Sequence, residues 1–84
     1  MIHQIAAKYG AKRIRVFGSV ARGEANTNSD LDLLVNMEAH RSLFDLGGLQ
    51  FDLEKSLEIP VDLVTENGLS GEMRTRILKE AIDL

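Results

Sequence analysis

The 84-residue sequence contains no cysteine and no tryptophan, and it has a single proline. The absence of cysteine excludes disulfides and thiolate metal sites, and it fits a reducing compartment, so we expect a cytoplasmic protein. No apolar run reaches the roughly 18 residues that a membrane-spanning helix needs, and we therefore expect no membrane partner. The first ten residues, MIHQIAAKYG, lack the long apolar stretch of a signal peptide.

An excess of positive charge is also missing, because the net charge is −3 at pH 7. Bulk electrostatics therefore do not attract nucleic acid, and we expect no direct DNA binding. The basic residues form two local groups, from Lys8 to Arg15 and from Arg74 to Lys79, among acidic neighbours. Such interspersed charges are typical of a solvated mixed surface. His3 and His40 have no partner at metal-ligand spacing and are expected at the surface.

The length favours a single domain spanning residues 1–84. Apolar periodicity predicts helices over 2–9, 42–57 and 69–83 and strands over 14–17, 30–36 and 59–65. Ser42 is the expected cap of the middle helix, and the Gly47-Gly48 pair predicts a kink or a later start. A helix of this length suits a parallel crossover, whereas the short link between the first two strands permits antiparallel pairing. The fold class is therefore α/β (α+β), a small mixed sheet of about three strands with helices packed on it.

Two aspartates, Asp30 and Asp32, interrupt an apolar strand. Residues two apart in a strand share a face, so both carboxylates point the same way, where they repel each other. Asp62 occupies an equivalent position in the third strand and can reach the same site if the two strands are neighbours. Clustered carboxylates are the ligands that Mg²⁺ or Mn²⁺ prefers, and shared carboxylates can bridge two such ions. A lone pair of solvated aspartates at a strand end is the alternative.

A glycine turn, Gly18-Ser19, ends the first strand, and Ser19 is the expected N-cap of a short helical turn through Arg22. Glycine permits close backbone approach, and free N–H groups at such a turn can bind phosphate. Arg22 could pair with a phosphate oxygen or with a carboxylate. These features predict a triphosphate site beside the metal site.

Together these stretches, GSVARG (18–23), DLD (30–32) and VDLV (61–64), resemble the minimal nucleotidyltransferases of the DNA polymerase beta-like superfamily. The resemblance implies transfer of NMP from an NTP, with AMP from ATP as the expected case. It implies that Asp30 and Asp32 bind two Mg²⁺ or Mn²⁺ ions, and that Asp62 completes one shell and helps to deprotonate the acceptor hydroxyl. It also implies that Gly18 and Ser19 hold the triphosphate. Arg22 matches an arginine common in the subgroup.

The same resemblance implies a biological role. Short members are often antitoxins encoded beside a HEPN-domain ribonuclease toxin, and some are thought to add AMP to a tyrosine of that toxin. Two other functions stay open: the protein could neutralise such a partner by contact alone, or it could be the catalytic subunit of a small-molecule nucleotidyltransferase. The wide apolar arc of the helix over 69–83 predicts a protein-binding surface, and homo-oligomer formation is left open.

Overall fold

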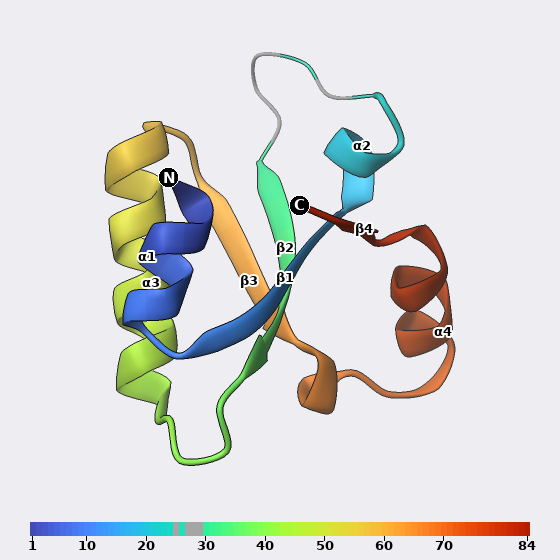
Figure 1. The fold of residues 1–84 in the computed structure, drawn as a ribbon. Helices are drawn as coiled ribbons and strands as arrows, with labels where there is room; N and C mark the ends of the chain where they lie inside the picture. Colours follow the sequence, from blue (N-terminus) through green and yellow to red (C-terminus); the bar gives the residue numbers. More distant parts are fainter. Residues whose placement is uncertain (25, 27–29) are drawn as a thin grey trace.

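The structure is a computed structural model that describes residues 1–24, 26 and 30–84 (Figure 1). The predicted loop over 23–30 includes residues 25 and 27–29, which lie outside this description. The helices are α1 (Ile2–Lys8), α2 (Gly18–Ala21), α3 (Leu43–Leu57), the 3-10 turn η1 (Glu66–Gly68) and α4 (Gly71–Glu80). The strands are β1 (Ala11–Phe17), β2 (Leu31–Met37), β3 (Val61–Thr65) and β4 (Ile82–Asp83). In the described part of the chain no helix is long and apolar enough to cross a membrane.

The strands form one mixed sheet in the order β3-β2-β1-β4. The β1–β2 pair is antiparallel and the β2–β3 pair is parallel, with α3 as the crossover between them. The predicted α/β fold, its mixed sheet and the directions of these two pairings are therefore confirmed. The expectation of about three strands was short by one, because β4 pairs antiparallel with β1.

Helices cover both faces of the sheet: α1 and α3 lie on one side and α4 on the other (Figure 1). The central strand β2 is therefore buried on both faces. Leu33 and Val35 pack with Leu49 and Leu53 of α3, whereas Leu34 packs on the opposite face with Leu69 and other residues next to or within α4. Since side chains alternate along a strand, Asp32 shares the face of Leu34 and lies on the α4 side.

The Gly47-Gly48 pair does not interrupt α3, which is continuous from Leu43 to Leu57. Ser42 caps the helix as predicted, in a capping box with Asp45. Gly48 is required for packing, because a Cβ there would lie 2.6 Å from Cε1 of Tyr9. The Tyr9 hydroxyl donates a 2.6 Å hydrogen bond to Asp52 of the same helix. The predicted later start of the helix is therefore wrong, and glycine at residue 48 makes room for an aromatic ring.

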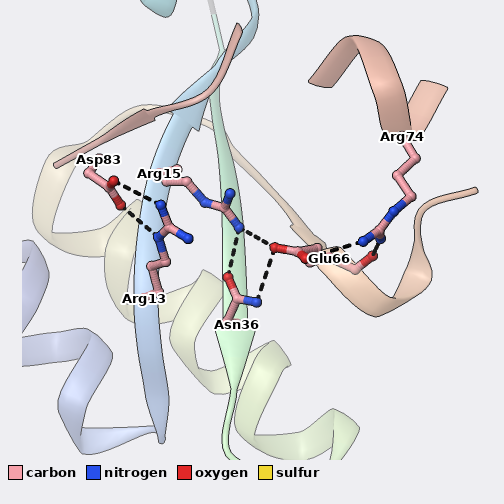
Figure 2. Close-up of polar contacts among 6 residues, drawn as sticks. All are labelled: Arg13, Arg15, Asn36, Glu66, Arg74 and Asp83. Carbon is pink, nitrogen blue, oxygen red and sulfur yellow. Dashed lines mark hydrogen bonds and ion pairs between the residues drawn. The ribbon is translucent and has the colours of Figure 1, made fainter. Parts of the chain in front are cut away.

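The last predicted helix is shorter than expected, since α4 ends at Glu80 rather than continuing to residue 83. Ala81 has extended backbone angles, and the chain then adds Ile82 and Asp83 to the free edge of β1. The Arg13 guanidinium binds Asp83 through two hydrogen bonds of 2.9 Å (Figure 2). The apolar pattern of this segment fits a helix and an edge strand equally well, and only the unpaired edge of β1 selects the strand.

Arg15 departs from the prediction of a solvated basic surface, because only 7% of the residue is exposed. It lies on the sheet face that α4 covers, and its guanidinium binds Asn36 at 2.9 Å and also Glu66 (Figure 2). Glu66 in turn accepts a 3.2 Å bond from Arg74 of α4. A buried cation needs such partners, and this chain of contacts ties α4 and η1 to the sheet. Arg15 Nε is buried and lacks a hydrogen-bond partner among the described residues.

Candidate active site

The register of β2 and β3 brings two of the three predicted carboxylates together. Asp32 and Asp62 are directly paired residues on these adjacent parallel strands, each close to the start of its strand. Asp32 is partly buried and Asp62 is exposed. Asp30 is exposed and immediately precedes β2. The end of the sheet where β2 and β3 begin therefore presents an acidic pair, and the third carboxylate, Asp30, immediately precedes β2 in the chain.

The electrostatics of this pair oppose ionisation. Burial raises the pKa of Asp32 above its ordinary value, and the neighbouring carboxyls of Asp62 and Asp30 raise it further. The charge of Arg22 acts in the opposite direction and lowers that pKa. The folded protein thus holds a carboxylate whose charged form is disfavoured without a nearby cation.

Gly18 places the start of α2 against Asp32. Phe17, the last residue of β1, pairs with Asp32, and the chain then turns directly into α2 because Gly18 has a φ of 74°. A Cβ on Gly18 would overlap Oδ2 of Asp32 and lie 3.1 Å from its Cγ. The absence of a side chain at residue 18 is therefore what lets this carboxylate sit over the turn.

Ser19 lies within α2 and does not cap it, so the predicted N-cap is wrong. The left-handed conformation of Gly18 lets the helical turn begin one residue earlier, with Phe17 at the N-cap position. Ser19 is half-buried, and no hydrogen bond of its hydroxyl occurs among the described residues. Arg22 forms the C-cap of α2 and pairs with Glu24 at 3.0 Å and with Glu80 at 3.3 Å. The structure therefore contains the carboxylate pairing predicted for Arg22.

The sequence prediction missed Glu80, the last residue of α4. The backbone N–H of Gly18 donates a 2.6 Å hydrogen bond to Oε2 of Glu80, across 62 positions of sequence. Nothing in the local pattern around Glu80 marks it, because it belongs to a helix predicted on apolar spacing alone. Its carboxylate adds a fourth acidic group to the three aspartates that the sequence predicted for the site.

The donor set suits a hard divalent cation, since carboxylate oxygens are its preferred ligands and Asp32 and Asp62 are adjacent. Burial and, after it, the neighbouring carboxyls of Asp62 and Asp30 raise the pKa of Asp32, and a bound cation would favour its charged form. Within residues 1–24, 26 and 30–84, however, no three histidine or acidic side chains are close enough together to hold one ion. Asp32 and Asp62 would supply two ligands, and Asp30, which precedes β2, would have to move closer to provide a third.

A hollow of about 450 Å³ lies at the opposite end of the sheet, beside the start of β1 and the ends of β2 and β3. Residues of both charges line it, among them Lys12, Glu38, Arg41 and Glu66. It contains none of the predicted site residues. The candidate active site is therefore assigned from the carboxylates and the Gly18 turn and not from this hollow.

Comparison with protein families identifies the family of the chain. The model of the nucleotidyltransferase domain family matches residues 2–84, almost the whole chain. The chain belongs to this family. As a nucleotidyltransferase, it transfers a nucleoside monophosphate from an NTP to an acceptor. This confirms the resemblance noted in the sequence.

The relatives narrow the class within the nucleotidyltransferases. A candidate protein adenylyltransferase from Methanocaldococcus jannaschii is 42% identical over 80 residues, which cover 95% of this chain and 86% of the relative. The protein adenylyltransferase MntA from Thermococcus cleftensis is 37% identical over 79 residues, covering 94% and 80%. Similarity of this extent relates the nucleotidyltransferase described here to protein adenylyltransferases of the MntA type.

Solved structures agree with the fold of this nucleotidyltransferase. A candidate minimal nucleotidyltransferase has a TM-score of 0.89 and 51% sequence identity, covering 99% of this chain and 85% of that one. A toxin–antitoxin complex with AMP-PNP contains a chain with a TM-score of 0.83 and 23% identity, covering 98% and 68%. The second match shows that the fold is shared. The chain therefore has the minimal nucleotidyltransferase architecture.

Proposed function

We propose that this nucleotidyltransferase transfers AMP from ATP to a hydroxyl of a partner protein, and that it acts as the antitoxin of a HEPN-domain ribonuclease toxin. The pairing of Asp32 with Asp62, directly over the Gly18 turn, is the observation that carries the proposal. The names of the relatives support the acceptor class, since one is a protein adenylyltransferase and another is a candidate protein adenylyltransferase. One solved structure of the same fold is an MntA–HpeT toxin–antitoxin complex, which supports the partner class. The proposal treats residues 1–84 as one cytoplasmic domain.

The chemistry assigns a role to each residue. The acceptor oxygen attacks the α-phosphorus of ATP while its proton passes to Asp62, and the bond from the α-phosphorus to the bridging oxygen breaks to release pyrophosphate. Mg²⁺ or Mn²⁺ ions, two in the expected case, would be held by Asp32 and Asp62 with Asp30, and would supply neutralising charge for the phosphates. Gly18 N–H, the Ser19 hydroxyl and Arg22 would bind the triphosphate.

A two-label experiment tests this reaction. The protein is incubated with its co-encoded neighbour, Mn²⁺ and ATP labelled at either the α- or the γ-phosphate. AMP transfer predicts that the neighbour acquires the α label and that the γ label leaves in pyrophosphate. Asp62→Asn should lose the labelling, whereas Glu72→Gln, an exposed change on α4, should keep it. Labelling of the neighbour by γ-labelled ATP, or by neither, would contradict the proposal.

A second candidate function, neutralisation by contact alone, is favoured by one surface. Leu43, Phe44 and Phe51 of α3 are 83%, 93% and 65% exposed, although each is large and apolar. A patch of this kind is typical of a protein-binding surface. The expected surface on the last helix is smaller, because Leu69 and Ile77 are buried there. The α3 patch, defined by these three exposed residues, is therefore the proposed contact for the toxin.

Two variants separate the candidates in an assay of toxin activity. Under the enzymatic proposal Asp62→Asn fails to neutralise the toxin while still binding it. Under the contact alternative Asp62→Asn neutralises normally, and Phe51→Ser abolishes both binding and neutralisation. Phe51→Ser should leave the melting temperature almost unchanged, because the ring is largely exposed.

A further inference from the structure

The carboxylate of Glu80 occupies donors on two different parts of the candidate active site. Gly18 N–H donates to Oε2 at 2.6 Å, and Nη1 of Arg22 lies 3.3 Å from both carboxylate oxygens. The Glu80 side chain is only 23% exposed. A backbone N–H at the start of a turn and a guanidinium are also the donors that phosphate oxygens take in proteins. Glu80 thus lies where a phosphate would bind.

A phosphate and Glu80 cannot use these donors together. A single N–H that already donates at 2.6 Å has no second acceptor position of equal quality. The two anions would also repel each other at this separation, in a partly buried place where water screens charge less than in bulk. An NTP that reaches Gly18 must therefore displace the carboxylate.

We infer that Glu80 is an internal competitor of the NTP, a carboxylate that holds the phosphate-binding donors of Gly18 and Arg22 until a triphosphate replaces it. The inference rests on the proposed function, which assigns those donors to the triphosphate. It goes further by making affinity for the nucleotide depend on the last residue of α4. Because Ala81 and β4 follow directly, triphosphate binding releases the contact that joins α2 to this end of the chain.

The test compares Glu80→Gln with Glu72→Gln, since both remove one negative charge from α4, and Glu72 is exposed and lies about two helical turns from Glu80. Dissociation constants are measured by calorimetry for three probes: ATP, inorganic triphosphate and adenosine. Charge-assisted hydrogen bonds of this kind predict that Glu80→Gln binds ATP and inorganic triphosphate about ten-fold more tightly than wild type. Adenosine, which has no phosphate, should bind all three proteins equally, and Glu72→Gln should match wild type.

Three other outcomes would overturn the inference. Weaker ATP binding by Glu80→Gln means that Glu80 orients Arg22 and does not compete with phosphate. Equal affinities, together with normal AMP labelling of the neighbour, remove this inference and leave the proposed function intact. If wild type and variant bind neither ATP nor inorganic triphosphate, the proposed function and this inference both fail. Glu80→Asp, which keeps the charge and shortens the reach, should also bind ATP more tightly, and melting curves confirm that each variant is folded.

Discussion

Replacing Gly18 by alanine tests the geometry of the site most directly, because two separate effects act on one methyl group. The φ of Gly18 is 74°, a left-handed conformation that costs an L-residue about 1–2 kcal/mol. The added Cβ would also overlap Oδ2 of Asp32 and lie 3.1 Å from its Cγ. To restore ordinary contact, the carboxylate would have to retreat by roughly 1 Å.

The expected loss of stability follows from these two effects. Overpacking of this kind costs about 1–3 kcal/mol, so Gly18→Ala should lower the free energy of unfolding by about 2–5 kcal/mol in total. For a domain of this size each kcal/mol corresponds to about 4–8 °C in melting temperature. AMP transfer should fall to background, because Asp32 is displaced from Asp62.

Gly23→Ala is the matched control for the backbone effect. Gly23 has a φ of 72°, but among the residues that the structure describes none, apart from its chain neighbours, lies within 4 Å of where its Cβ would be. It should lose only the backbone contribution, about 1–2 kcal/mol, and keep AMP transfer. Urea denaturation and the labelled-ATP assay on both variants decide the matter. Equal destabilisation of the two variants, with transfer intact in Gly18→Ala, would refute the close approach of Asp32 to the turn.

Three further predictions concern the metal site, the buried ion pairs and the core. Asp32→Asn should abolish AMP transfer, yet in EDTA it should melt at or above the wild-type temperature. In wild type the pKa of Asp32 is raised in the folded state, so the stability of wild type falls as the pH rises through that value and the carboxylate becomes charged. Millimolar Mn²⁺ should raise the melting temperature of wild type more than that of the variant. A clearly lower melting temperature of Asp32→Asn in EDTA would argue against this. The hydrogen bond with Arg15 is the main cause that lowers the pKa of Glu66. Its stabilisation is therefore present above the ordinary glutamate pKa of about 4.3 and is lost as the pH falls through the lowered value. Melting temperature against pH should therefore flatten on the acid side in Glu66→Gln, and an unchanged acid limb would contradict the pairing. Leu34→Ala removes a side chain that is 0% exposed and should lower the free energy of unfolding, measured by urea denaturation, by about 2–5 kcal/mol. A loss under about 1 kcal/mol would contradict the packing of Leu34 on the sheet face that α4 covers.

The features that the sequence predicted well are those set by near neighbours. The cap of α3 depends on Ser42 and Asp45, three positions apart. The alternation of Asp32 with Leu33 depends only on the strand period of two. The link lengths on either side of β2 decided between antiparallel and parallel pairing. Such signals lie within one element or in the link between two successive strands, and so they can be read without coordinates.

Register is the first thing that the tertiary structure alone decided. The alternation placed Asp62 on one face of its strand, but only the pairing of β2 with β3 put it opposite Asp32. A shift of one residue would have sent Asp62 to the other face. The edge strand β4 has the same origin, because the unpaired edge of β1 draws Ile82 and Asp83 out of the predicted helix.

Contacts between segments that are far apart in the sequence are the second feature that the tertiary structure alone decided. Arg15 looked like a solvated cation because its burial depends on where α4 packs, and its partner Glu66 is 51 residues away. Glu80 carried no signal because its role depends on the end of α4 meeting the start of α2, 62 positions earlier. A glutamate at the end of an amphipathic helix is ordinary in sequence. Its contact with Gly18 and Arg22 arises only when the chain closes on itself, since the strength of an ion pair depends on distance in space and not along the chain.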